Sequence, residues 1–243
     1  MTDKLTDEQV KRYSCSTFLK EIGEQGQLKL LNAKVLVVGA GGLASSVLMY
    51  LVSSGIGFLG VIDDDKVSLD NLPRQILFNA SEVGKKKVIV AKERLEQLNS
   101  DTKVTIYDKR LTNDNAEELF KDYDLILDCV DNFETKFLIN DICVKLHKPF
   151  VTAGVSDYKG QVMSYIPSQS KHDFKSLFSE LPINIEQKYK DEDRGVFPPS
   201  VGIISNIEVC EALKIIIGAG KPLIDEMLVV DTLDWYFHKI VIK

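Results

Sequence analysis

The sequence has few of the features that are typical of secreted proteins, membrane-spanning proteins or proteins with a structural zinc site. Only 4 of its 243 residues are cysteine, and no two of them form a Cys-x-x-Cys pair, so a four-thiolate zinc site has no basis. No apolar stretch has the length of a membrane-spanning helix, and the first residues, "MTDKLTDEQVKRYS", lack the apolar segment of a signal peptide. We therefore expect a cytoplasmic protein.

Excess positive charge is absent as well. Lys and Arg total 30 against 36 Asp and Glu, which gives a net charge of −6. This balance argues against a general attraction for nucleic acid or anionic membranes, although it leaves room for a local basic site. With 44% hydrophobic residues the chain can bury a large core, so we expect one globular unit.

Valine-rich apolar runs alternate with helical patterns through the first two thirds of the chain. Residues 34–39, "KVLVVG", are typical of a strand that is buried on both faces of a parallel sheet. Glycines, a helical pattern and a second apolar run, "FLGVIDDD", complete a strand-helix-strand unit with a right-handed crossover. The sequence thus predicts an α/β fold with a Rossmann-type, mostly parallel sheet and flanking helices.

The same alternation continues as far as residue 160. A long helix is expected to open at Ser81 and Glu82, and a strand is expected at 103–108. Two more helices and a buried strand lead to a further strand that begins at Pro149.

Beyond Gly160 the pattern changes. Residues 168–195 have no steady periodicity, and a connection of this length indicates a functional or mobile segment. A last helix is expected at about 200–217, followed by two closing antiparallel strands in which Trp235 is a packing aromatic.

A glycine turn, "GAGGLA", follows the first strand and opens the first long helix. Its spacing is G-x-G-x-x-G/A, with Gly39, Gly41 and Gly42 placed where phosphate would approach the backbone. Asp63, at the end of the next strand, would accept hydrogen bonds from ribose hydroxyls. The glycines could instead make only a tight turn, but the order of strand, glycines, helix and acid favours nucleotide binding.

Cations and a second acid follow the strands of this unit. The planar fork of Arg74 and the compact charge of Lys87 together suit a triphosphate, although each alone is more often a solvating charge. Asp131 and Asn132 follow a strand; a carboxylate there would hold magnesium, and the alternative is an ordinary helix cap. An NAD-dependent oxidoreductase, the default for this fold, leaves these residues without a task.

Several segments together carry a family resemblance. "RYS", "GQLKLLNAKVLVVGAGGLA", "DNLPRQILF", "VGKKK", "LDCVDNFETKFLIN" and "VGIISNIEVCEALKIIIGAGKPL" resemble, in order, the ThiF/MoeB/HesA family, bacterial relatives of ubiquitin-activating enzymes. The resemblance implies an adenylyltransferase that uses ATP and Mg²⁺ to adenylate the C-terminal glycine of a ubiquitin-fold sulfur carrier ending in Gly-Gly. The carrier would be ThiS-like or MoaD-like, for thiamine or molybdopterin biosynthesis, and the enzyme a homodimer.

The resemblance also implies roles for individual residues. Residues 1–160 would be the nucleotide-binding half and 161–243 the carrier-binding half of one adenylation domain, with a mobile loop at about 168–195 over the carrier's tail. Arg74, Lys87 and Asp131 would be catalytic, with Asp131 binding Mg²⁺. The nucleotide-binding set would be Gly39, Gly41, Gly42, Asp63, Asp65, Asn71, Arg74, Gln75, Lys87, Asp131 and Asn132.

Three departures from the family pattern leave alternatives open. Cys15 and Ser16 stand where members have Arg-Gln, whose arginine reaches the partner subunit's ATP; Lys11 and Arg12 are the nearest substitutes. The family's zinc cysteines are missing at "DFKSLFSE" and before the chain ends, so no zinc is expected. "KDEDRGVF" carries no thiol, so neither a persulfide nor a thioester is expected, and no rhodanese-like domain is expected either. The alternatives are a nucleotide-binding scaffold or partner subunit without turnover, and activation of a peptide C-terminus.

Overall fold

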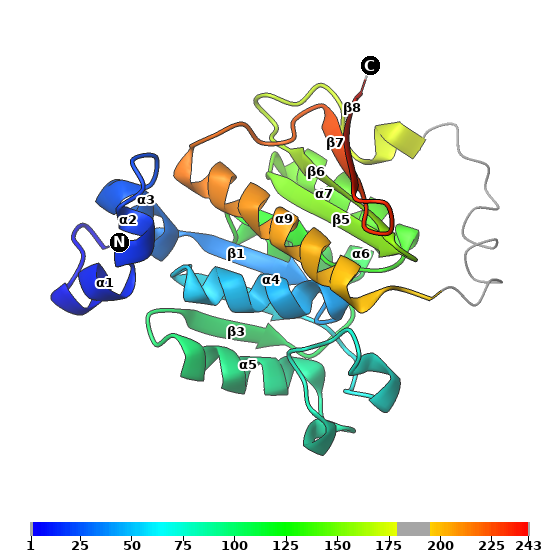
Figure 1. Ribbon diagram of the computed structural model, residues 1–243, viewed down its shortest axis with the longest axis horizontal. Coiled ribbons are helices and arrows are strands. Elements are labelled where there is room, and N and C mark those ends of the chain that lie inside the picture. The colour runs from blue at the N-terminus through cyan, green and yellow to red at the C-terminus, as the bar shows by residue number, and fades with distance from the viewer. Residues whose placement is uncertain (1, 179–194, 243) are drawn as a thin grey trace.

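A computed structural model describes residues 2–178 and 195–242 as an eight-stranded sheet with helices on both faces (Figure 1). The strand order is β3-β2-β1-β4-β5-β6-β7-β8; the first five strands are parallel and the last three antiparallel. The strands are β1 (Lys34–Val38), β2 (Phe58–Ile62), β3 (Lys103–Tyr107), β4 (Leu125–Asp128), β5 (Phe150–Ser156), β6 (Lys159–Tyr165), β7 (Glu226–Asp231) and β8 (Tyr236–Val241). The predicted fold class is confirmed.

Helices cover the two faces unequally. The α-helices are α1 (Asp7–Arg12), α2 (Ser14–Thr17), α3 (Gly23–Asn32), α4 (Gly42–Ser53), α5 (Lys87–Leu98), α6 (Asn113–Lys121), α7 (Phe133–Leu146) and α9 (Pro198–Ile217). Short 3-10 turns are η1 (Leu69–Asn71), η2 (Ala80–Glu82) and η3 (Lys175–Phe178). Helices α4, α5 and α9 lie on one face, α6 and α7 lie on the other, and α1 to α3 lie beyond the amino end of β1 (Figure 1). None of the described helices is long and apolar enough to cross a membrane.

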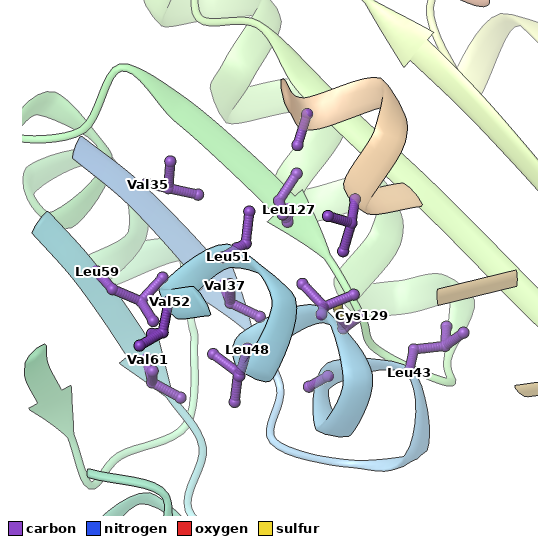
Figure 2. Packing of buried hydrophobic residues seen from close by; sticks show 14 of the residues in the cluster. Val35, Val37, Leu43, Leu48, Leu51, Val52, Leu59, Val61, Leu127 and Cys129 are labelled. Atoms are coloured by element: carbon purple, nitrogen blue, oxygen red, sulfur yellow. The ribbon is translucent and has the colours of Figure 1, made fainter. Parts of the chain in front are cut away.

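The central strands are apolar on both faces, as the continuous runs predict. In β1, Val35 and Val37 pack against α4, whereas Leu36 and Val38 belong to the separate cluster under α6 and α7. Figure 2 shows the α4 side, where Leu48 and other helix residues meet β1, β2 and β4. This packing holds the strand ends in place, and the loops beyond them carry the polar residues of the candidate site.

The predicted helix start at Ser81 and Glu82 is wrong. These residues form η2, where Asn79 and Glu82 close a capping box. The chain then turns at Gly84, whose φ of +90° is left-handed, and α5 begins at Lys87. A capping box stabilises any first turn, so it closed a short 3-10 turn here rather than the long helix.

The expectation for Trp235 is also wrong. The ring is 68% exposed in the turn between β7 and β8, where the residue has a φ of +54°. β8 is the edge strand and all six of its residues are exposed, so the β8 side of this hairpin does not cover the indole.

The predicted stretch 168–195 lies largely outside the described residues, which stop at 178 and resume at 195. Its described beginning is anchored: the backbone amides of Lys171 and His172 donate to the Asp225 carboxylate, and that of Lys175 donates to Asn140 Oδ1. The division into halves at residue 160 stays a prediction, and a single sheet runs through both.

Candidate nucleotide site at the carboxyl ends of the strands

The glycine turn follows β1, between the ends of β2 and β4. The backbone amide of Gly39 donates to the Ile62 carbonyl, and that of Cys129 donates to the Val38 carbonyl. Gly39 has a φ of +98°, and an added Cβ would lie 3.1 Å from the Cys129 carbonyl oxygen. A side chain would be both strained and crowded there, so the turn requires glycine.

An open cradle lies at the start of α4. Gly41 is the N-cap, and no side chain caps the first turn, so backbone N–H groups remain available. The nearest atom to a Cβ added at Gly41 would be Gln75 Nε2 at 3.8 Å, and one added at Gly42 would lie 3.6 Å from Arg74 Cγ. A helix N-terminus of this kind favours an anion.

The "NLPRQ" segment therefore lies close to the glycine turn. The backbone amides of Arg74 and Gln75 both donate to the Asn71 carbonyl, which folds the segment into a turn. Arg74 Nη1 donates to the Asp70 carbonyl at 2.9 Å, and buried Asn71 donates from Nδ2 to Asp70 Oδ2 at 3.2 Å. Gln75 is buried and its Oε1 has no hydrogen-bond partner among the described residues. The segment thus places a half-buried guanidinium and the buried Gln75 amide, whose oxygen is an unpaired acceptor, beside the uncapped start of α4.

Asp63 joins the end of β2 to the same turn. Its Oδ2 accepts from the Ala40 backbone amide at 2.7 Å and its Oδ1 accepts from the Asp65 amide at 2.8 Å. Burial raises the pKa of the Asp63 carboxyl, and these two amides, together with the charge of Lys87, oppose that shift. Each carboxylate oxygen keeps a second lone pair with which it can accept from a ligand hydroxyl.

Lys87 has a protein partner of its own. It is the first residue of α5, its side chain is buried, and Nζ donates to Asp65 Oδ2 at 2.9 Å. This carboxylate offsets the unfavourable placement of a cation at a helix start. Lys87 is therefore tied to the acids after β2.

Asn132 and Asp131 have separate environments. Asn132 is the N-cap of α7, and its Oδ1 accepts from the Thr135 amide at 2.9 Å, so the helix-cap alternative is confirmed for this residue. Asp131 is exposed, and in the described part of the chain no hydrogen bond or ion pair joins it to Arg74 or Lys87. That these three side chains share one triphosphate stays a prediction.

A second cluster of acids lies on the same edge. The carboxylates of Asp63, Asp64 and Asp65 lie within 4.8 Å of one another, and no other such group of metal-ligating side chains occurs among residues 2–178 and 195–242. Asp131 is not part of this cluster.

The sequence-based reasoning missed a buried ion pair just below these loops. Lys136 Nζ lies 3.0 Å from Asp128 Oδ2, and the two side chains are 8% and 1% exposed. The signal was available: Lys136 precedes buried Ile139 and Cys143 by three and seven positions, which places it on the inward face of α7. Glu208 shares this signal on α9, where it is fully buried among apolar residues.

Arg12, a nearest substitute for the missing family arginine, lies at the other end of the sheet from the glycine turn of its own chain. It pairs with Glu8 at 3.8 Å and with Asp101, just before β3, at 4.0 Å. Within one chain Arg12 is thus separated from the turn by the length of the strands.

Comparisons with known proteins point the same way as this geometry. The ThiF family model matches residues 13–243. Over 98% of its length the chain is 38% identical to "Sulfur carrier protein adenylyltransferase" of Thermus thermophilus, and the match covers 89% of that protein. Over 94% of its length it is 40% identical to "Adenylyltransferase and sulfurtransferase MOCS3" of Culex quinquefasciatus, and the match covers 52% of that protein. The structure of E. coli MccB with MccA superposes with a TM-score of 0.84 at 25% identity, covering 95% of this chain and 71% of that chain; MccB has also been solved with ATP.

Proposed function

Because the chain belongs to the ThiF family, we propose that it uses ATP and Mg²⁺ to adenylate the C-terminal glycine of a small ubiquitin-fold sulfur carrier ending in Gly-Gly. The carrier serves thiamine or molybdopterin biosynthesis, and the enzyme works as a homodimer. The observation that carries this proposal is the uncapped start of α4, with Arg74 and Gln75 close to its glycines.

The residues on this edge fit ATP. The space above Gly41, which a Cβ would fill, together with the free N–H groups of α4, accommodates phosphate oxygens. Arg74 and Gln75 donate to the phosphates from one side, Lys87 adds a charge from the other, and Asp63 accepts from the ribose. Asn71 supports Arg74, because both contact Asp70.

Asp131 would hold the Mg²⁺, which neutralises part of the triphosphate charge when bound. Its carboxylate is exposed at the end of β4, next to the loop that touches the glycine turn. The carboxylates of residues 63–65 form the other oxygen-rich group on this edge, so the assignment to Asp131 is open to a direct comparison between the two.

The reaction is an in-line displacement. A carboxylate oxygen of the carrier's last glycine forms a bond to the α-phosphorus, and the bond from that phosphorus to the bridging oxygen breaks, so pyrophosphate leaves with the electron pair. A carboxylate is already a competent nucleophile, so no residue must remove a proton. The protein aligns the two reactants and neutralises the charge that develops, which is the work assigned to Arg74 and Lys87.

ATP–pyrophosphate exchange with purified carriers tests the proposal. We expect exchange with a ThiS-like or MoaD-like carrier ending in Gly-Gly, and none with the same carrier lacking its last glycine or carrying a C-terminal amide. Binding of ATP without exchange for any carrier would favour the scaffold alternative. Exchange with a free peptide but with no carrier would favour activation of a peptide C-terminus.

A further inference from the structure

One buried carboxylate ties three parts of the chain together below the loop that carries Asp131. Asp128 Oδ1 accepts from the Val130 backbone amide at 3.2 Å, while Oδ2 accepts from Thr152 Oγ1 at 2.6 Å and from Lys136 Nζ at 3.0 Å. Val130 belongs to the loop, Thr152 to β5 and Lys136 to the first turn of α7. Asp128 is therefore the common anchor of the loop, the sheet and the helix.

Lys136 makes the tie between helix and sheet. Besides the Asp128 carboxylate, its Nζ donates to the Ala153 carbonyl of β5 at 2.6 Å, so one ammonium bridges two strands from the start of α7. The exposed Asp131 lies between these fixed points, directly before the helix cap at Asn132. An ammonium buried in this way is costly to desolvate, and well-packed apolar residues can often replace such a pair without loss of stability. Stability alone is therefore a weak reason for this pair.

Among the described residues, no carboxylate other than that of Asp128 forms an ion pair with the Lys136 ammonium. On the opposite face of β4, Cys129 Sγ contacts Glu208 Oε1 at 3.5 Å. Burial and the negative charge of Asp128 raise the pKa of the Glu208 carboxyl well above its usual range, which favours the neutral form of this second acid. The ring of Phe174 covers the ammonium at 6.0 Å.

We propose that Lys136 is a positioning residue that holds the Asp131 loop in its working place by tying the start of α7 to Asp128 and to the Ala153 carbonyl. It acts through the loop and does not touch the reactants. The consequence for catalysis rests on the proposed function, whereas the consequence for loop order does not. These contacts of Lys136 with Asp128 and the Ala153 carbonyl give the charged pair a task that an apolar pair filling the same space could not perform.

The test uses the full chain with both charges of the pair removed. In the Asp128→Asn/Lys136→Met variant the asparagine oxygen can still accept from the Val130 amide and its Nδ2 can donate to Thr152 Oγ1, so the tie that is lost is the one from α7 to the strands. Removing both charges also avoids leaving a carboxylate buried without its partner. The matched control is Lys145→Met on the same helix, because Lys145 is 62% exposed and pairs with Glu117 at the surface.

Two measurements decide the outcome. In the double variant, amide hydrogen exchange measured without any substrate should be about tenfold faster at residues 131–136, while exchange at the β1 and β4 amides stays unchanged. The carrier-dependent kcat of this variant should fall about tenfold, with an unchanged KM for ATP. Lys145→Met should match the wild type in both. Unchanged exchange at 131–136, or an unchanged kcat, would overturn the proposal. A wild-type protein without pyrophosphate exchange would refute the proposed function and the catalytic half of this inference, while hydrogen exchange would still decide whether Lys136 orders the loop.

Discussion

The two ends of the parallel sheet differ in how most of their polar side chains are paired. At the amino end, Asp101 collects hydrogen bonds from the Tyr13 hydroxyl at 2.7 Å and from Gln9 Nε2 at 3.2 Å, and Arg12 adds an ion pair. Asn99 Nδ2 in turn donates to the Tyr13 hydroxyl. These groups pair with one another and fasten the N-terminal helices to the sheet, while Gln27 Oε1 and Thr102 Oγ1 at this end are buried without a hydrogen-bond partner among the described residues.

At the carboxyl end, the protein fixes several polar groups in place but leaves part of their hydrogen-bonding capacity unused. Gln75 keeps an unpaired oxygen, α4 has no side-chain cap, and Asp131 is exposed. Arg74 is steadied by a backbone carbonyl and leaves its remaining N–H groups free for other acceptors. The difference indicates that substitutions at the amino end reduce stability, whereas substitutions at the carboxyl end reduce activity.

Removing the guanidinium beside the glycine turn should have the largest effect. We expect Arg74→Ala to lower kcat for carrier adenylation by about 10²–10³-fold, because a preorganised donor to the developing charge is lost. The unfolding temperature should hardly change. Arg94→Ala, which breaks an ion pair with Glu82 at 3.0 Å on the neighbouring α5, is the control and should retain activity. Equal losses in the two variants would erase the distinction between the two ends.

The two acidic groups at the carboxyl end can be separated next. Asp131→Asn should raise the Mg²⁺ concentration needed for half-maximal exchange by at least about tenfold, because even outer partners of metal ligands have effects of that size. Asp64→Asn, which changes an exposed member of the other cluster, should have little effect. The reverse ranking would move the metal to residues 63–65.

A stability loss is expected at the amino end. Tyr13→Phe removes a hydroxyl that donates to Asp101 and accepts from Asn99, both close to Tyr13 in a buried setting. The free energy of unfolding should fall by about 1–2 kcal/mol in a urea titration. The activity of the folded fraction should be unchanged, and a drop in kcat would show that the two ends are coupled.

The smallest effect concerns pH and the buried acid below the site. Glu208 binds its proton more tightly in the folded protein than in the unfolded chain, because burial raises its pKa. The wild type should therefore lose stability as pH rises above about 4.3, the usual Glu value, whereas Glu208→Gln has no proton to lose there. In urea titrations at several pH values, the free energy of unfolding of Glu208→Gln should increase relative to that of the wild type from pH 5 to pH 9. A constant difference would mean that Glu208 is not held neutral.

Periodicity predicted most of the helices and strands, because burial on one or both faces leaves a repeat in the sequence. The glycine turn and its acid were also found, since each needs a particular residue type at a particular place. The start of α5 and the exposure of Trp235 were not, because a capping box and an aromatic residue do not specify what packs on them. Lys136 and Glu208 were visible as charges on apolar helix faces, but their partners come from distant segments.

By itself, the sequence determined the alternation of elements, the glycine turn and the family, because these depend on local residue types and on their order. Only the tertiary structure decided that Arg74 and Gln75 lie on the glycine turn, that Lys87 is paired with Asp65, and that Asp128 joins loop, sheet and helix. The adjacent strands β2 and β1 bring Arg74 and Gln75 to the glycine turn, and the adjacent strands β4 and β5 with α7 surround Asp128; the distance along the chain between these residues carries no record of that closeness.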